Sequence, residues 1–197
     1  MTRTVPGGLL PAANVQERMW LAERLEPGLG RYNVPYAWEV RGRLSPAALA
    51  TAVATVIERH EILRTTFVEH DGRLYQRVDE PWTPSVATVN LRGLPGARQL
   101  LTGWLSEQAR KPFDIGTNRL LRLGVAELDG DRQVLFLGLH HLVSDAASLP
   151  LFLRELRAVY RQPALLPEPS PGDRPIRPAE PAGGASIPKL PRPGGPQ

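Results

Sequence analysis

Residues 134–145 read VLFLGLHHLVSD, an apolar run that ends in two adjacent histidines and, four residues after the second, an aspartate. In a strand, successive side chains point to opposite faces. Because positions 134–137 are all apolar, both faces of a strand here would be apolar. We therefore predict a strand over 133–139 that lies inside a sheet and is covered on both faces.

Apolar spacing and turn residues predict the other elements around this strand. Ser45-Pro46 is a strong helix start, because Ser can cap and Pro is tolerated at the first helical position. Helices are expected at 14–25, 46–59, 97–110 and 146–160, and further strands at 36–41, 63–69, 74–78, 86–91 and 120–128. Asp71-Gly72 and Asp129-Gly130 predict two short hairpins. Helices mixed with hairpins predict an α+β fold with a mixed sheet covered by helices.

The composition divides the chain into two regions. Residues 163–197 include 11 Pro and 5 Gly among 35 positions. Such a segment has too little apolar surface to offset its ordering entropy. We expect residues 1–162 to form one lobe and residues 163–197 to be a disordered C-terminal tail.

Charge and residue usage exclude several classes of function. The net charge is +4 and the pI about 9.9, but the basic residues are scattered, which predicts solvated surface arginines rather than a nucleic-acid site. The chain has no cysteine, so thiolate chemistry and zinc–sulfur sites are excluded. Neither a signal peptide nor an apolar run of ~20 residues is present. We expect a cytoplasmic protein without membrane or nucleic-acid partners.

The two histidines of the opening stretch are candidates for chemistry. His140 and His141 should face opposite sides, so one can face a cleft while the other packs below. An imidazole titrates near neutral pH and can accept a proton. A metal site would need three convergent ligands, and the other histidines are His60 and His70. A purely structural histidine pair, with Asp145 as a helix cap, remains the main alternative.

A second stretch, RHEILRTTF at residues 59–67, joins a helix to a strand and holds four ionisable groups. Taken alone, this pattern is more typical of a solvated helix end than of a site. Ser144 is a weak nucleophile candidate, because it lacks the Gly-x-Ser-x-Gly turn.

Together these stretches resemble the condensation domains of nonribosomal peptide synthetases. HHLVSDA is similar to the HHxxxDG motif of that family, and RHEILRTTF matches RHExLRTxF at every specified position. Three further stretches match in the same order: VQERMW at 15–20 with AQxRLW, YNVP at 32–35 with YNxP, and PFD at 112–114 with PFD. The resemblance covers about residues 9 to 169.

The resemblance implies a chloramphenicol acetyltransferase-like fold and an amide-forming acyltransferase. Two such lobes form a V with a tunnel between them. Carrier proteins deliver thioesters on phosphopantetheine arms, and the acceptor amine attacks the donor thioester carbonyl. The resemblance implies no directly bound cofactor, and the diverging side chains of His140 and His141 predict no metal site.

The resemblance also implies roles for individual residues. His141 is expected to be the catalytic residue, either as general base or by positioning the amine. His140 is expected to support the loop from below. Asp145 is expected to be structural and held by an arginine, and the candidates are Arg64 of this chain and an arginine of the missing second lobe.

The chain departs from the family pattern in two ways. Ala146 replaces the motif Gly and Ala147 the common aromatic residue, which would strain the loop if φ at residue 146 were positive. The resemblance stops near Pro169, and the motifs of the second lobe are absent, as in a truncation, a frameshift product or half of a split enzyme. We therefore expect no activity from this chain alone.

Three functional hypotheses follow. The first is an N-terminal half of a condensation domain that works with carrier proteins and with a second-lobe polypeptide or by self-association. The second is a non-catalytic remnant or carrier-binding module. The third is a stand-alone CoA-dependent acyltransferase with sites between subunits. The first also predicts an exposed apolar patch of roughly several hundred Å² on the face that presents His141.

Overall fold

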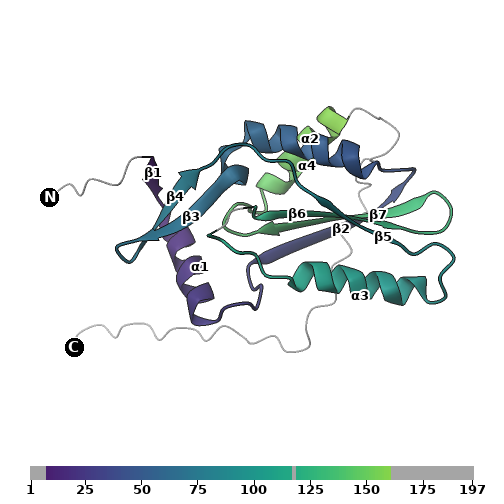
Figure 1. Cartoon of the computed structure of the whole chain (residues 1–197), viewed down its shortest axis with the longest axis horizontal. Coiled ribbons are helices and arrows are strands. Elements are labelled where there is room, and N and C mark those ends of the chain that lie inside the picture. The colour runs from purple at the N-terminus through teal and green to yellow at the C-terminus, as the bar shows by residue number, and fades with distance from the viewer. Residues whose placement is uncertain (1–7, 117–118, 161–197) are drawn as a thin grey trace, which may run out of the picture.

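A computed structural model describes residues 8–116 and 119–160. Its central element is a four-stranded sheet in the order β2-β7-β6-β5 (Figure 1). These strands span Asn33–Arg41 (β2), Arg132–His140 (β7), Leu121–Glu127 (β6) and Val86–Asn90 (β5). β7 runs antiparallel to both of its neighbours, whereas β5 pairs parallel with β6. The sheet is therefore mixed, as the sequence predicts.

β7 lies inside this sheet, between β2 and β6. Leu135, Leu137 and Leu139 pack into one apolar cluster, and Val134 and Phe136 pack into another on the opposite face. Each of these five side chains is at most 2% exposed. The prediction of a central strand covered on both faces is confirmed.

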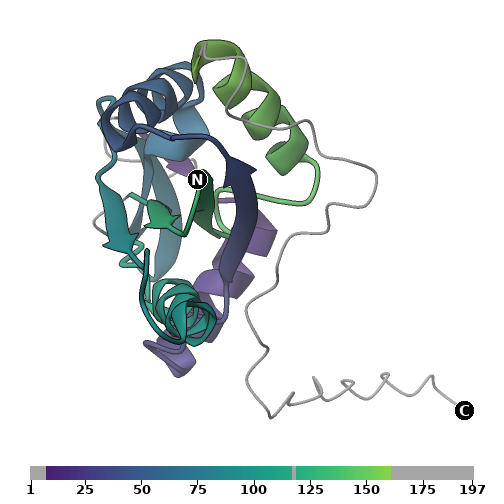
Figure 2. The ribbon, with the colours of Figure 1, turned by 90° about the vertical axis from the view of Figure 1, so that its right-hand side faces the viewer.

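Helices cover both faces of the sheet (Figures 1 and 2). Two of them, α2 (Pro46–Arg59) and α4 (Ser148–Tyr160), lie side by side on one face, and α3 (Ala97–Arg110) lies on the other. None of the helices within the described part of the chain has both the length and the apolar character needed to cross a lipid bilayer.

Ser45 joins the start of α2 to the end of α4. Its hydroxyl accepts a hydrogen bond from the Ala48 amide at 3.3 Å, and Pro46 occupies the first turn, as the sequence predicts. The Ser45 amide donates to the Tyr160 hydroxyl at 3.0 Å. The two helices are thereby linked by polar contacts as well as by the apolar cluster beneath them.

A smaller three-stranded sheet, in the order β1-β4-β3, lies at one end of the molecule (Figure 1). Its strands are Leu9–Pro11 (β1), Arg73–Val78 (β4) and Thr65–His70 (β3), and α1 spans Asn14–Leu25. The β3–β4 hairpin turns at Asp71 (φ 51°) and Gly72 (φ 72°), the positive pair that a two-residue hairpin loop favours. Trp20 of α1 packs in a third cluster with Phe67 and Leu74 of this hairpin.

Helices α1, α2 and α3 have the predicted bounds, whereas β2 begins at Asn33 rather than at residue 36, and two further elements differ for a reason that the hydrogen bonds show. Of the predicted strand at 63–69, residues 65–69 lie in β3, but residues 63 and 64 belong to a 3-10 turn, η1 (Glu61–Arg64), because the Leu63 amide bonds back to the His60 carbonyl at 3.0 Å. The last helix begins at Ser148 rather than Ala146, because residues 146 and 147 form a turn in which Oδ1 of Asp145 accepts from the Ser148 amide. An apolar pattern alone does not encode either hydrogen bond.

The predicted tail at 163–197 lies outside the described residues. The predicted apolar patch stays a prediction, although Ile62 and Leu151 are each 37% exposed close to the histidine-containing loop. Large apolar side chains of α1 are also exposed: Val15 by 56%, Leu21 by 51% and Leu25 by 82%.

Candidate active site

His140 is the last residue of β7, and its side chain is fully buried. Its Nδ1 atom accepts a hydrogen bond from the Leu142 amide at 3.1 Å, and its Nε2 atom lies 3.0 Å from Oε1 of Glu23. The rings of Tyr32 and Phe113 meet the imidazole edge-on, with centroids 6.2 and 5.9 Å away. The YNVP and PFD stretches of the sequence therefore converge on this histidine.

His141 follows the end of the strand and is exposed. Its amide donates a hydrogen bond to the Tyr32 carbonyl at 2.8 Å. Because Tyr32 directly precedes β2, this bond holds the backbone of His141 one residue beyond the end of β7. The residues two and four positions before it, Leu139 and Leu137, lie on the face covered by α2 and α4. His140 is buried and His141 is exposed, so the two imidazoles have different surroundings, and no cluster able to hold a metal ion occurs among the described residues.

Asp145 caps α4. Its Oδ1 atom accepts hydrogen bonds from the amides of Ser148 at 2.8 Å and Ala147 at 3.1 Å. The backbone and side-chain hydrogen bonds from Ser148 hold the pKa of the Asp145 carboxyl below its usual value, and the Ala147 amide and an electrostatic interaction with His141 act more weakly in the same direction. Of the two arrangements considered from the sequence, an arginine partner or a helix cap, the structure has the helix cap.

Arg64 does not meet Asp145. Its Nη1 atom donates to the Asp79 carbonyl at 2.7 Å, and Nη2 lies 3.5 Å from Glu61. The Thr66 hydroxyl binds the carboxylate of Asp79. No ion pair between Arg64 and Asp145 exists in the described residues, so Arg64 braces the turn between η1 and the end of β4 instead.

The start of the RHEILRTTF stretch connects α2 to α4. Arg59 and His60 both contact Oε2 of Glu155, at 3.1 and 2.8 Å. The hydrogen bond with His60 is the largest cause of the lowered pKa of Glu155, and the charges of His60 and Arg59 act in the same direction. The helix end is therefore partly exposed, but it is tied to its neighbour rather than simply solvated.

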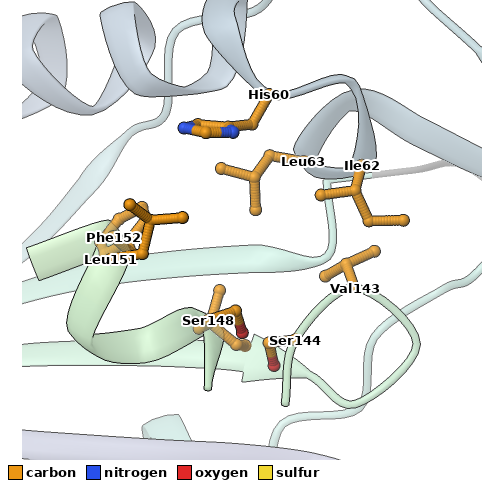
Figure 3. Close-up of a pocket in the computed structure, with 9 residues that line it drawn as sticks. His60, Ile62, Leu63, Val143, Ser144, Ser148, Leu151 and Phe152 are labelled. Carbon is orange, nitrogen blue, oxygen red and sulfur yellow. The ribbon is translucent and has the colours of Figure 1, made fainter. Parts of the chain in front are cut away.

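A cavity of about 150 Å³ opens between the two motifs; we call it the loop cavity (Figure 3). Its walls come from β7 and the loop after it, from η1 and from α4. Its lining residues are His60, Ile62, Leu63, Leu139, Val143, Ser144, Ser148, Leu151 and Phe152. Because most of these side chains are apolar, the cavity suits an apolar group more than a charged one.

The replacement of the motif Gly by Ala146 does not strain the loop. Among the residues that the structure describes, the non-glycine residues with positive φ are Asp71 and Arg119. Ala146 is therefore in a conformation that any L-residue adopts without the left-handed penalty. The concern that Ala146 reshapes the loop behind His141 is not supported.

Two side chains of α1 contribute to the site without having been expected. Gln16 donates from Nε2 to the Leu142 carbonyl at 3.1 Å, and Glu23 contacts His140. Gln16 belongs to the VQERMW stretch, so the motif match indicated its segment but not its contact with Leu142. Glu23 carries no such signal, because its partner lies 117 residues away in the sequence.

Arg122 of β6 holds the PFD stretch in place. It donates to the carbonyls of Lys111 at 2.6 Å and Pro112 at 2.8 Å, and its guanidinium lies 3.7 Å from the centroid of the Phe113 ring. Burial lowers the pKa of Arg122. This arginine thereby fixes the ring of Phe113 that packs against His140.

Comparison with known sequences agrees with these features. The sequence model of a family described as Condensation domain matches residues 8–171. A linear gramicidin synthase polypeptide from Brevibacillus parabrevis is 35% identical over 153 residues, which are 77% of this chain and 2% of that protein. Phosphinothricin tripeptide synthetase PhsB from Streptomyces viridochromogenes is 35% identical over 167 residues, which are 81% of this chain and 14% of that protein.

Solved structures share the fold. The first condensation domain of the CDA synthetase has a TM-score of 0.71 at 25% identity, covering 79% of this chain and 40% of that one. The starter condensation domain of rhizomide synthetase RzmA has a TM-score of 0.71 at 22% identity, covering 77% of this chain and 37% of that one. The chain thus spans less than half of these solved domains. With a family match over residues 8–171 and these folds in agreement, the chain belongs to the condensation domain family and has its chloramphenicol acetyltransferase-like fold.

Proposed function

We propose that this chain supplies the N-terminal lobe of a condensation domain that forms amide bonds in nonribosomal peptide synthesis. Its substrates are acyl or peptidyl and aminoacyl thioesters carried on the phosphopantetheine arms of carrier proteins. The observation that carries the proposal is the exposed His141, held by its amide at the end of a buried strand, between Leu139 and Val143, which line an apolar cavity that His141 itself does not line.

The reaction needs one proton to move. The acceptor amine attacks the donor thioester carbonyl, a C–N bond forms, and the C–S bond breaks with release of the phosphopantetheine thiol. His141 takes the proton from the amine, or holds the amine for attack, and the thiolate leaving group receives a proton in return. A rigid strand end suits this role, because a base contributes about 10² to 10⁴ in rate only when the reacting atom lies within hydrogen-bond reach.

Asp145 and His140 support His141 in this proposal. Asp145 caps α4 and closes the loop on one side, and His140 anchors it from the buried side. The loop cavity receives an apolar portion of a reactant close to the loop. In this proposal residues 1–162 form the lobe, and residues 163–197 take no part in catalysis.

The proposal requires a second lobe. The solved condensation domains extend well beyond the 37% and 40% of their length that this chain matches. The tunnel wall facing His141 would come from that remaining portion of a condensation domain. Carrier proteins dock on the assembled domain. The lobe alone does not hold the reacting groups in the geometry that a base needs to act as a catalyst.

The proposal is tested by reconstitution. The chain is mixed with donor and acceptor thioesters on carrier proteins, with and without a polypeptide that corresponds to the second lobe of a related condensation domain. Amide product is measured by mass spectrometry of the acceptor carrier. Product should form only in the complemented mixture. Product from the chain without a second lobe would contradict the proposal and favour a site built between identical subunits, and no product in either mixture would favour a carrier-binding module.

A further inference from the structure

Glu23 is the charged side chain that contacts the buried histidine. It lies on α1, and its Oε1 atom is 3.0 Å from Nε2 of His140. The His140 side chain is fully buried, whereas the Glu23 side chain keeps 22% of its surface exposed. A buried imidazole needs a partner for each nitrogen, and Glu23 is the partner of Nε2.

The other nitrogen fixes where the proton of the imidazole lies. Nδ1 accepts a hydrogen bond from the Leu142 amide, so it carries no proton of its own. The proton is then on Nε2, which donates to the Glu23 carboxylate. A protonated Nδ1 would face the Leu142 N–H donor to donor and would break this bond. The carboxylate therefore selects one neutral tautomer of His140.

This tautomer controls the backbone next to His141. The Leu142 amide binds Nδ1 of His140, and the Leu142 carbonyl accepts from Gln16. Gln16 and Glu23 are seven residues apart on α1 and thus lie on one helix face. Leu142 is therefore held at its carbonyl directly by α1, through Gln16, and at its amide by His140, whose other ring nitrogen meets Glu23 of α1.

We propose that Glu23 is a positioning residue, which acts through the tautomer of His140 to set the conformation of the loop that carries His141. Its effect on the reaction rests on the function proposed above, but its effect on the loop does not. Removing the carboxylate leaves the buried Nε2–H of His140 without an acceptor. The equilibrium constant for keeping the ring in its present position and tautomer then falls by about tenfold to a hundredfold. The ring then moves or exchanges tautomer, and the Leu142 amide loses its acceptor.

The loop is tested first, in the chain without any partner. Nitrogen-15 NMR of the His140 ring reports which nitrogen is protonated, and hydrogen exchange reports the protection of the Leu142 amide. In the unsubstituted chain Nε2 must carry the proton. Glu23→Leu should change the ring signals and speed Leu142 exchange about tenfold or more, whereas Glu23→Gln, which still offers an amide oxygen, should preserve both.

Glu58→Leu, at an exposed position of α2, is the matched control for the loss of a helical carboxylate and should change neither signal. A proton on Nδ1 in the unsubstituted chain overturns the inference even if Glu23→Leu does not fold. Ring signals and Leu142 exchange that are unchanged in a folded Glu23→Leu chain overturn it as well.

Amide formation with the second lobe is measured next. Glu23→Leu should lower kcat by about tenfold to a hundredfold with little change in KM, the scale seen when a carboxylate that orients a histidine is removed, and Glu23→Gln should restore most of it. Equal kcat in Glu23→Leu and the unsubstituted chain overturns the positioning role. If the unsubstituted chain forms no amide, the proposed function fails, and the NMR and exchange results alone decide the inference.

Discussion

Replacing Ala146 by glycine restores the family's motif residue, and we predict that it weakens the protein instead of improving it. The residue does not have positive φ, so glycine relieves no strain there. Glycine does enlarge the conformational freedom of the unfolded chain, which lowers the free energy of unfolding by about 0.4–1 kcal/mol. For a domain of this size that corresponds to a fall in Tm of about 1–4 °C.

Thermal unfolding followed by circular dichroism measures this change. Gly72→Ala is the informative comparison, because φ at Gly72 is 72° and no atom lies within 4 Å of the added Cβ. Only backbone strain then acts, and a loss of about 1 kcal/mol is expected. If Ala146→Gly raised Tm by several degrees, or increased amide formation in the complemented domain, the conclusion that the loop is relaxed would be refuted.

Three further predictions concern packing and pH. Gly124→Ala should lower the free energy of unfolding in urea by about 1–3 kcal/mol, because its Cβ would lie 2.6 Å from Cη2 of Trp104. Adding Trp104→Leu should recover part of the loss, and losses of the two single variants that simply add in the double variant would contradict this reason. Leu156→Ala should cost about 2–5 kcal/mol, because this α4 residue is 1% exposed in the main core, and a loss below about 1 kcal/mol would show that α4 is loosely packed. The Asp145 carboxyl should titrate below its usual pKa in NMR, and Ser148→Ala should raise this pKa only in part, because the backbone amide of residue 148, the largest cause, is retained. Since the folded pKa is the lower one, the stabilising contribution of Asp145 is present above the unfolded pKa and is lost as pH falls through the folded pKa. A carboxyl that titrates at its usual pKa in the unsubstituted chain would contradict the assigned cause.

Local pattern was sufficient where one physical signal dominated. The run at 134–137 is apolar at every position, and only a strand covered on both faces buries all of it. Ser45-Pro46 started a helix because capping and the fixed φ of proline act within a few residues. Adjacent histidines at a strand end had to separate, and one is buried while the other is exposed.

Other features depend on contacts between distant parts of the chain. The 3-10 turn at Glu61–Arg64 resembles the start of a strand in sequence, since Ile62 and Leu63 are apolar, and only its backbone bonding distinguishes it. On α1 the apolar residues Val15 and Leu21 are exposed, and the face that meets the site carries Gln16 and Glu23.

The choice between an arginine and a helix cap for Asp145 was likewise open from the sequence. It depended on whether Ser148 or a distant guanidinium came closer, and Ser148 lies three residues away. The resemblance to condensation domains pointed to the right segments. It did not supply the polar contacts that hold them together, because those join residues more than 100 positions apart.

The central claim is that His141 performs the chemistry of an amide-forming domain. Its most direct test is the single-turnover rate of amide formation in the complemented domain, compared between the unsubstituted chain, His141→Ala and the control His70→Ala at the exposed end of β3. His141→Ala should lower the rate by about 10² to 10⁴ with an unchanged Tm, and His70→Ala should match the unsubstituted chain. Equal rates in His141→Ala and the unsubstituted chain would contradict the account.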